Sequence, residues 1–413
     1  MASFSFVHAA DLHLGSPFRG LALRDREVSE RFAQATRSAF VALVERTLAA
    51  GARFLVIAGD VYDGEWKDSA IGLFFNREIA RLDRAGIPVF LLRGNHDAES
   101  VVTRSIPLPD SVRTFSARRP ETHVLEDVAV ALHGQSFAER QARDNLARAY
   151  PAPLAGHVNI GVLHTSLTGR PPHADYAPCS LEDLTARGYD YWALGHVHGY
   201  EVVHADPPVV YPGNLQGRNI RETGEKGAVL VHVEDGRVTG LERLVVDTAR
   251  WARLDLDIAV CADISDVLAR VKGEAEAVAQ AAQGRLVALR VRLSGATDLH
   301  DRLLSGRARL REEIEAVCHH VDPDLWLEKL RLDLAPLEAA PLDADSALDL
   351  QTLLDAAARD DDVAQAAEAA LADLGRKMPP GLLDPDRPFG EEVASLIDEA
   401  RAVLAARLRT QDG

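Results

Sequence analysis

Five apolar runs recur in the first half of the chain, and each stops at a cluster of polar residues. The runs read FSFVHAA, RFLVIAG, PVFLLRG, VNIGVLH and YDYWALG. They are continuous rather than alternating, which predicts strands buried on both faces of a parallel sheet. In open α/β sheets the functional groups gather at the carboxyl ends of the strands. We therefore expect the polar residues after the runs to converge on one rim, although they are far apart in the sequence.

The polar residues on this rim are of the kinds that bind metal ions. They are Asp11, His13, Asp60, Asp63, Asn95, His96, Asp97, His164, His196 and His198. Such a mixed set of oxygen and nitrogen ligands suits Mn, Fe, Zn or Co better than Ca or Mg, and the absence of thiolates argues against structural zinc. Two cations here predict phosphoester hydrolysis. Gly59, Gly94 and Gly195 each precede a ligand, where we expect a side chain to crowd the site.

The pattern of apolar and polar residues changes after Asp247. WARLDLDIAV, RLVALRVRL and LWLEKLRLDL read as strands, and the segments between them have helical spacing that begins at an Asp. We expect three parts: an α/β domain with the site at residues 1–247, a βαβαβ unit at residues 250–337, and a helical segment at residues 345–413. Cys318, His319 and His320 end one of the helical patterns, and we interpret them as structural.

The last part is predicted to form amphipathic helices. SALDLQTLLDAAARDDDVAQAAEAALADLGRKM and FGEEVASLIDEARAVLAARLRT carry Ala/Leu stripes beside acidic faces. Their apolar surface is too small for them to fold well alone, so we expect them to dock on a partner protein. Packing on the preceding unit and pairing with a second copy are the alternatives.

Composition favours a multi-domain cytoplasmic protein. A length of 413 residues is enough for two or three domains. Cys179, Cys261 and Cys318 show no paired spacing, which favours a reducing compartment. No segment approaches the roughly 18 apolar residues of a membrane span. We expect no cleavable leader, because the first apolar run already delivers Asp11 and His13.

A net charge of −17 argues against a broad nucleic-acid surface, because affinity for DNA comes mainly from neutralising its phosphates. Binding would have to be local. The segment YPGNLQGRNIRETGEKG brings Arg218, Arg221 and Lys226 together on a Gly-rich loop that can approach a backbone. This loop and the metal ions are the predicted sources of positive charge.

The clusters match a known set of motifs. D-x-H, G-D-x-x-D, G-N-H-[DE], a lone His and G-H-x-H are all intact, and in this the chain resembles the calcineurin-like metallophosphoesterases. The opening HAADLHLGSPF and the YPGN loop resemble SbcD-type DNA repair nucleases, most closely their YhaO-like branch, over residues 1 to about 245. The Arg that clamps a phosphomonoester in the protein phosphatases of the superfamily is missing from GDVYDGE.

The resemblance implies a four-layer αββα sandwich, with residues 250–337 as a small α/β cap that guides DNA and with C-terminal helices after it. It also implies two metal ions, most commonly Mn. The implied ligands are Asp11, His13 and His198 for one ion, Asn95, His164 and His196 for the other, and Asp60 between them.

The resemblance further implies roles for residues around the metals. His96 would stabilise the transition state or protonate the leaving oxygen, and Asp63 would orient His96. Asn214, Arg218 and Arg221 would contact the substrate, although many relatives carry Ser at the position of Asn214.

The expected function is that of a DNA exonuclease with some endonuclease activity, working with an SMC-like ATPase of the SbcC or YhaN type. A second copy could pair through RFAQATRSAFVALVERTLAA and SAIGLFFNREIARLDRAG, with Ile71, Phe74 and Phe75 as an apolar patch, unless these side chains pack on the sheet. A small-nucleotide phosphodiesterase or phosphatase is the first alternative, which the acidic charge favours. A non-catalytic scaffold is the second, which the complete ligand set disfavours.

Overall fold

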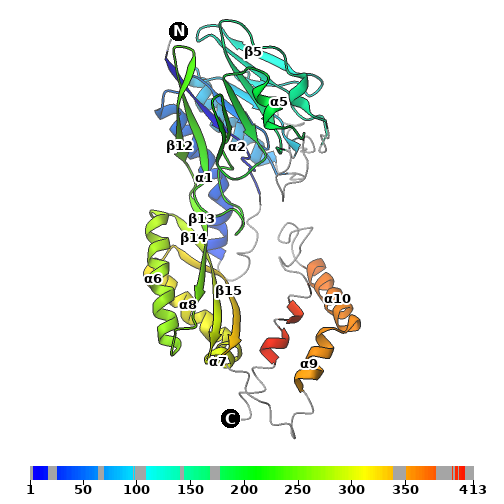
Figure 1. The fold of residues 1–413 in the computed structure, drawn as a ribbon. Helices are drawn as coiled ribbons and strands as arrows, with labels where there is room; N and C mark the ends of the chain where they lie inside the picture. Colours follow the sequence, from blue (N-terminus) through cyan, green and yellow to red (C-terminus); the bar gives the residue numbers. More distant parts are fainter. Residues whose placement is uncertain are drawn as a thin grey trace. The chain divides into compact units, whose positions relative to one another are not determined.

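The computed structural model divides the chain into two compact units, whose elements are drawn in Figure 1. It describes residues 3–16, 26–63, 69–95, 97, 108–139, 144–167, 177–337, 350–377, 393, 396–398 and 400–404. The first unit comprises the described residues of Met1–Ser16, Glu30–Arg218 and Gly224–Ala249. The second comprises those of Pro17–Ser29, Asn219–Thr223 and Arg250–Gly413.

The first unit is built on two six-stranded sheets. One has the order β12 (Arg237–Val245), β11 (Gly227–Glu234), β1 (Phe4–Ala9), β2 (Leu55–Ala58), β3 (Val89–Leu92), β4 (Val112–Thr114). The other has the order β5 (Glu121–Leu125), β6 (Val130–Gly134), β7 (Val158–His164), β8 (Tyr191–Gly195), β10 (Pro208–Tyr211), β9 (Glu201–Ala205). An apolar core joins the sheets face to face. β1, β2 and β3 run parallel, as do β6, β7 and β8.

Helices cover the outer face of each sheet. α1 (Arg26–Ala49) and α2 (Ser69–Arg84) pack on the first sheet. The 3-10 helix η1 (Leu146–Ala149) and the short α5 (Leu181–Thr185) pack on the second. The unit is therefore the four-layer αββα sandwich that the sequence predicts.

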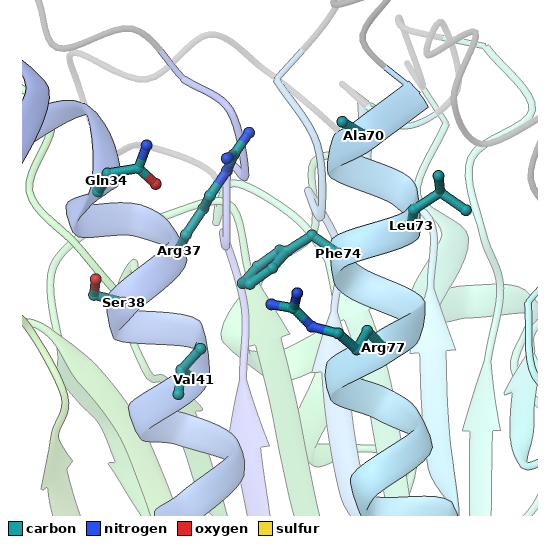
Figure 2. Close-up of a pocket in the computed structure, with 8 residues that line it drawn as sticks. All are labelled: Gln34, Arg37, Ser38, Val41, Ala70, Leu73, Phe74 and Arg77. Atoms are coloured by element: carbon teal, nitrogen blue, oxygen red, sulfur yellow. The ribbon is translucent and has the colours of Figure 1, made fainter.

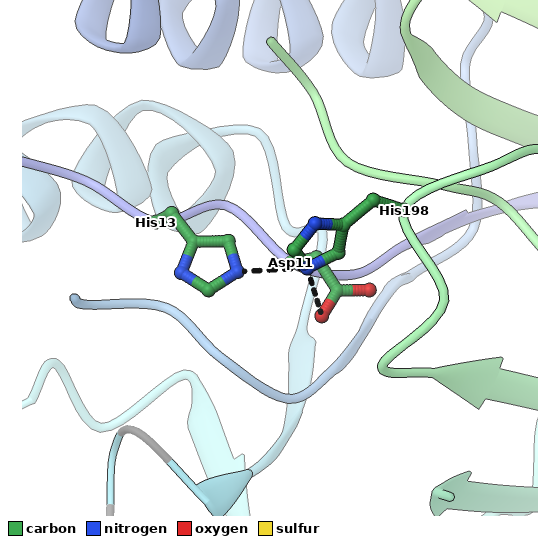
Figure 3. A group of neighbouring side chains, drawn as sticks. All are labelled: Asp11, His13 and His198. Carbon is green, nitrogen blue, oxygen red and sulfur yellow. Dashed lines mark hydrogen bonds and ion pairs between the residues drawn. The ribbon is translucent and has the colours of Figure 1, made fainter. Parts of the chain in front are cut away.

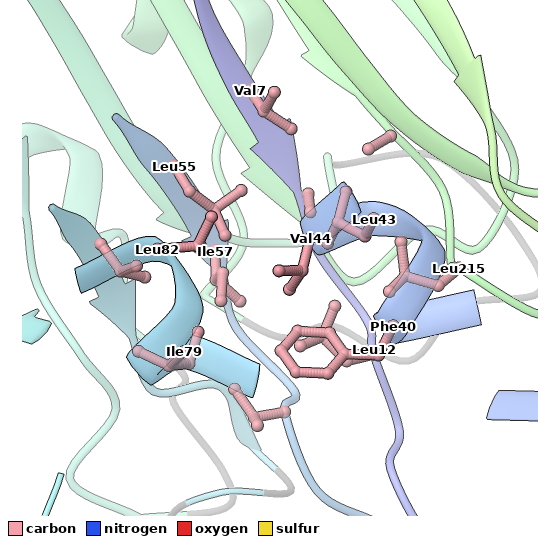
Figure 4. Packing of buried hydrophobic residues seen from close by; sticks show 14 of the residues in the cluster. Val7, Leu12, Phe40, Leu43, Val44, Leu55, Ile57, Ile79, Leu82 and Leu215 are labelled. Carbon is pink, nitrogen blue, oxygen red and sulfur yellow. The ribbon is translucent and has the colours of Figure 1, made fainter. Parts of the chain in front are cut away.

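The central strands are buried on both faces, as their continuous apolar runs predict. Along β2, Leu55 and Ile57 point into the core under the helices, whereas Val56 and Ala58 point into the core between the sheets. β1 divides in the same way, because successive side chains of a strand point to opposite faces. Figure 4 shows the helix-side core, with Val7 and Leu55 from the strands near Val44 of α1.

The patch predicted on α2 turns out to be mostly core. Ile71 and Phe75 are buried and lie one helical turn apart on the face that packs against the sheet. Phe74 is half-buried at the edge of that core, and Leu73 is 62% exposed. Of the two alternatives, packing on the sheet is therefore confirmed for Ile71 and Phe75, and the exposed apolar side chain of this helix is Leu73.

His8 is a packed residue of β1, as the sequence predicts. It lies in the core, where the hydroxyl of Tyr191 is 3.0 Å from its Nδ1 and the carbonyl of Leu194 is 3.1 Å from its Nε2. Nε2–H donates to the carbonyl, which leaves Nδ1 to accept from the hydroxyl. The imidazole therefore ties β1 of the first sheet to β8 of the second, just before both strands reach the rim.

The second unit holds a three-stranded sheet in the order β13 (Ala249–Asp257), β14 (Leu286–Thr297), β15 (Leu325–Pro336), with β14 and β15 parallel. α6 (Ile264–Ala282) and α8 (Arg307–Val321), with α7 (His300–Ser305) before it, bury their apolar side chains against this sheet. Asp263 caps α6, since its carboxylate accepts from the Asp266 N–H at 3.0 Å. The three predicted strands and the two predicted helical segments are confirmed.

The C-terminal segment departs from the prediction in one place. The long helix predicted before residue 378 is two helices, α9 (Leu350–Ala358) and α10 (Asp361–Lys377). The Asp360 carboxylate accepts from the Asp362 N–H at 2.8 Å, and such local capping by an Asp competes with a continuous helix. Beyond it, residues 396–398 and 400–404 are helical. Among the described helices, none combines the length and the apolarity needed to cross a membrane.

Candidate metal centre

The predicted ligands follow strands of both sheets of the first unit. Asp11, Asp60 and Asn95 follow the parallel strands β1, β2 and β3. His164 ends β7, and His196 and His198 follow β8. Because the carboxyl ends of parallel strands share one edge, each sheet brings its own ligands to its rim. The two rims meet where Nδ1 of His164 donates to the carbonyl of Ala58 at 2.9 Å.

The first group of ligand atoms comes from Asp11, His13 and His198 (Figure 3). The Nε2 atoms of the two imidazoles lie 3.2 Å apart, and Nε2 of His198 lies 3.9 Å from Oδ1 of Asp11. One ligand atom from each residue lies within 4.8 Å of the other two. The three side chains can therefore surround a single cation.

The second group is formed by Asp11, Asp60 and His164. Asp11 is thus common to both groups, whereas the resemblance implies Asp60 as the residue between the two ions. Nε2 of His164 lies 3.3 Å from Oδ2 of Asp60 and 3.0 Å from Oδ1 of Asn95. Two adjacent ligand sets that share a carboxylate are the arrangement of a two-metal site.

His196 completes the cluster through its ring and its backbone. The ring centroids of His196 and His164 are 5.3 Å apart. The His196 N–H donates to both carboxylate oxygens of Asp11, at 3.2 and 3.0 Å, which fixes that carboxylate between the two groups. The structure thus brings together all seven residues predicted as ligands.

Four of these residues have a backbone conformation that only glycine adopts readily. The φ angles are +52° at Asp11, +44° at His13, +53° at Asp60 and +99° at His196. A positive φ costs a residue with a Cβ on the order of 1–3 kcal/mol, and such strain concentrates where it positions functional groups. The rim therefore orients its ligands at a cost in stability.

Buried charge is the second unusual property of the centre. Asp11, Asp60 and His164 are at most 1% exposed. Burial raises the pKa of Asp11. Burial also disfavours charge on His164, but the carboxylates of Asp60 and Asp11 outweigh it and raise the pKa of His164 to about 9. The pocket thus favours positive charge between its carboxylates, and a divalent cation bound to deprotonated ligands supplies it.

Glycines allow the two rims to approach, as the sequence predicts. A Cβ at Gly94 would lie 2.2 Å from Oδ1 of Asp60, and one at Gly195 would lie 2.0 Å from the carbonyl oxygen of Ala58. Gly59 has a φ of +102°, and a Cβ there would lie 2.3 Å from Nδ1 of His164. Substitution of these glycines would displace ligands directly.

Asp97 has a larger role than sequence reasoning gives it. Its carboxylate is buried and accepts from the N–H groups of Val61, Tyr62 and Gly94, each at 3.1 Å. It thereby joins the loop after β2 to the loop after β3. Burial, and secondarily the charge of Asp60, raise its pKa to about 7. The motif G-N-H-[DE] contains an acidic residue here, but nothing in the motif names the three donors.

Asp63 lies beside a predicted metal ligand. The Ser16 hydroxyl donates to its Oδ2 at 2.7 Å, its Oδ1 lies 3.8 Å from Nδ1 of His13, and Nη1 of Arg218 lies 3.9 Å from Oδ2. His96, which Asp63 was predicted to orient, lies outside the described residues. The structure therefore places Asp63 where it can orient His13, and its pairing with His96 stays a prediction.

The predicted substrate-binding residues divide between the two units. Arg218 belongs to the first unit, and its Nη2 lies 3.1 Å from Nδ1 of His198. Asn214 is buried there, and its amide donates to the Gln216 carbonyl at 2.9 Å, so it helps to shape the loop. Arg221 is exposed and belongs to the second unit. The contacts of all three with a substrate stay predictions.

Lys226, which the sequence places among the positive charges of the Gly-rich loop, is a neighbour of the centre. It is buried, and its Nζ donates to the carbonyl of His198 at 2.8 Å. Its own N–H donates to the carboxylate of Asp247 at 3.0 Å. Arg218 and Lys226 thus hold the ring and the backbone of the same predicted metal ligand.

Comparisons with known proteins agree with this geometry. Residues 4–200 match the family of calcineurin-like phosphoesterases, and residues 251–335 match the middle domain of the metallophosphoesterase YhaO. The uncharacterised metallophosphoesterase YhaO of Bacillus subtilis is 35% identical over 243 residues, which are 58% of this chain and 60% of that protein.

Proteins named for DNA repair are also similar. The DNA double-strand break repair protein Mre11 of Methanopyrus kandleri is 28% identical over 275 residues, 60% of this chain and 57% of that protein. The protein of the same name in Haloferax volcanii is 25% identical over 392 residues, 89% of this chain and 82% of that protein. The chain spans about 60% of the length of the first two relatives. With intact motifs, converging ligands and both family matches in chain order, the chain belongs to the calcineurin-like metallophosphoesterases, in the branch that includes YhaO.

Proposed function

We propose that this chain is a phosphodiesterase that uses two divalent metal ions to degrade DNA from its ends in DNA repair. The observation that carries the proposal is the pair of ligand groups sharing Asp11, with Arg218 and Lys226 held against His198 beside them. A divalent centre flanked by cationic side chains suits an anionic diester. The similarity to proteins named for double-strand break repair supports DNA as the substrate.

The proposed ligands are Asp11, His13 and His198 for one ion, Asn95, His164 and His196 for the other, and Asp60 for both. Bound there, two divalent cations supply Lewis acidity, which neutralises charge on phosphoryl oxygens and activates water near neutral pH. Mn is the proposed metal, with Fe, Zn and Co as alternatives, because the donors are imidazoles and oxygens without thiolates.

The residues around the ligands would do the remaining work. Asp63 accepts from Ser16 and faces Nδ1 of His13, so it would hold that ring in position. Arg218 would bind a phosphate of the substrate from its place beside His198, and Asn214 and Arg221 would add further contacts. His96 would stabilise the transition state or protonate the leaving oxygen.

The test is cleavage by the chelator-treated, full-length protein after addition of Mn. The substrates are linear duplex DNA, closed circular DNA, single-stranded DNA and bis(p-nitrophenyl) phosphate, with Mg, Fe, Zn and Co in parallel. His96→Ala is the variant, and His157→Ala is the matched control, because His157 precedes β7 at the end opposite His164. The expected result is Mn-dependent loss of linear DNA, resistance of closed circles, an inactive His96→Ala and an active His157→Ala.

Two outcomes would count against the proposal. Hydrolysis of the small diester without any cleavage of DNA would favour a small-nucleotide phosphodiesterase, which the net charge of −17 suits. Absence of hydrolysis with every metal would favour a scaffold.

We also propose that the C-terminal segment, residues 345–413, docks on an SMC-like ATPase of the SbcC or YhaN type, with residues 250–337 acting as a cap on residues 1–247. Leu353 of α9 and Leu374 of α10 are exposed apolar side chains on helices rich in Ala. Leu353→Asp with Leu374→Asp should abolish co-elution with a purified YhaN-type ATPase and leave hydrolysis of the small diester intact.

Free, buried cysteines at positions 179, 261 and 318 support a cytoplasmic location.

A second copy of the chain is a further proposed partner, at the groove between α1 and α2 (Figure 2). Arg37 of α1 and Arg77 of α2 both lie over the ring of Phe74, at 5.8 and 5.3 Å from its centroid, beside the exposed Leu73. If this groove joins two copies, Leu73→Asp will shift a dimer to a monomer in sedimentation velocity. An unchanged mass would exclude it.

A further inference from the structure

The backbone just after the metal ligand His198 is held on several sides. Its carbonyl accepts from Nζ of Lys226 at 2.8 Å and from the N–H of Asn214 at 3.4 Å. Gly213 packs against the same segment, since a Cβ there would lie 3.0 Å from the His198 carbonyl oxygen and 3.1 Å from the Tyr200 nitrogen. The chain from His198 to Tyr200 is therefore fixed relative to the candidate metal centre.

Tyr200 carries an aromatic ring out of this fixed segment. The side chain is 42% exposed, whereas most aromatic side chains of the described residues are buried. The guanidinium carbon of Arg243 lies 4.4 Å from the ring centroid. A guanidinium over an aromatic face stabilises the ring in one orientation.

Arg243 is itself immobilised by the backbone. Its Nη1 donates to the carbonyl of Pro212 at 2.6 Å and its Nη2 to the carbonyl of Glu225 at 3.3 Å. Both carbonyls belong to the loop that also supplies Gly213 and Asn214. The exposed ring of Tyr200 thus rests on a cation that is bonded to the scaffold, and little ordering is left for a ligand to induce.

The distance between this ring and the candidate metal centre suits a polymeric substrate. Two residues of chain span at most about 7 Å, so the Cα of Tyr200 lies within that distance of the Cα of His198. The ring is therefore close enough to the candidate metal centre for one nucleic-acid strand to reach both. A strand with one phosphate at the metals would therefore bring a neighbouring base to the ring.

We propose that Tyr200 is a stacking platform for a nucleobase close to the cleaved phosphodiester. The inference rests on the proposed function and specifies its substrate as a strand with an unpaired base at that position, either single-stranded DNA or a frayed duplex end. Stacking on an aromatic ring tolerates any base, since every base has a π face. Together with Arg218, Lys226 and Arg243 around one segment, the ring lets a chain of net charge −17 bind DNA locally.

The first experiment measures stacking without catalysis. Full-length protein in chelator is titrated into oligonucleotides that carry a fluorescent 2-aminopurine at successive positions from one end. We expect the fluorescence to be quenched at one or two adjacent positions with the wild type and with Tyr200→Phe, which keeps the ring. Tyr200→Ala should lose the quenching, whereas Val202→Ala, which removes an exposed aliphatic side chain two residues away, should retain it. Equal quenching with wild type and Tyr200→Ala, or none with either, would overturn the proposal.

The second experiment measures the contribution of the base to cleavage. An abasic site at the quenched position should lower kcat/KM of the Mn-loaded wild type about tenfold, because stacking of one base is worth about that factor or more. The same abasic site should cost Tyr200→Ala less than about twofold, because its stacking is already lost. Equal losses in both proteins would assign Tyr200 a purely structural role.

The two experiments separate the stacking inference from the proposed function. Quenching that depends on Tyr200, without cleavage of any DNA, would refute the nuclease and leave the base-binding site in place. Cleavage of DNA without any effect of Tyr200→Ala would refute the platform alone.

Discussion

The rim of the candidate metal centre and the sheet of the second unit differ in backbone strain and in buried charge. At the rim, four ligand-bearing residues have positive φ angles and the carboxylates of Asp11 and Asp60 are buried. Among the described residues of the second unit, the non-glycine residue with positive φ is Gln283, which ends α6 in an ordinary C-cap. Its core is an apolar cluster that includes Leu289 and Ile314. Strain and buried charge are thus concentrated where ligands are held, and we expect substitutions in the two regions to affect different properties.

The largest expected effect comes from removing the carboxylate of Asp60. Asp60→Asn keeps the volume but removes a buried charge that faces Nε2 of His164 at 3.3 Å. We expect kcat/KM for bis(p-nitrophenyl) phosphate to fall by about ten-thousandfold, the equivalent of about 5 kcal/mol. Metal content measured by mass spectrometry should fall as well, while urea unfolding in chelator changes by less than about 1.5 kcal/mol. Retention of both metals would contradict the assignment of Asp60.

The reverse pattern is expected in the second unit. Leu289→Ala removes a fully buried side chain of β14 and should lower the free energy of unfolding by about 3–4 kcal/mol in urea titrations that resolve this unit. Val260→Ala is the matched control, because Val260 is 79% exposed and should change stability by less than about 0.5 kcal/mol. Metal content should stay the same in both variants. A loss of metal in Leu289→Ala would show that the units are coupled.

His8 should make the first unit sensitive to acid. Burial lowers its pKa to about 3, against 6.5 in the unfolded chain. Between these values the unfolded state binds a proton that the folded state rejects, so stability falls as the pH drops below 6.5. The loss should reach about 3 kcal/mol at pH 4. Urea titrations of wild type and His8→Asn in chelator isolate this contribution, because Asn does not titrate. Equal pH slopes in the two proteins would refute it.

The smallest expected effect is that of a methyl group at Gly94. In Gly94→Ala the new Cβ would meet Oδ1 of Asp60 at 2.2 Å, and the displaced carboxylate should weaken metal binding by about 10–100-fold in competition with a chelator. Gly199→Ala is the matched control next to His198, since its Cβ would meet no heavy atom within 4 Å. Similar metal affinities in the two variants would mean that the rim is more compliant than its contacts indicate.

Much of the fold and the location of the centre could be predicted from the sequence. A buried strand is recognisable as an apolar run, and the polar residues after its carboxyl end lie at the rim of the sheet. The sequence left open whether Ile71 and Phe75 are exposed or packed on the sheet, and coordinates were needed to show that both are buried and that Leu73 is exposed. The bonds from Val61 and Tyr62 to Asp97 were missed because these two donors belong to another loop. Bonds between a side chain and a distant backbone leave no periodic pattern, so they need coordinates.

The division of the ligands between two sheets has a consequence for synthesis of the chain. Asp11, His13, Asp60 and Asn95 follow strands of the first sheet, and His164, His196 and His198 come from the second. A nascent chain that has emerged only as far as β6 holds four of these seven ligands and lacks the second-sheet histidines of both groups. On the proposed ligand assignment, metal binding therefore requires both sheets, and a fragment that ends at β6 lacks part of each ligand group.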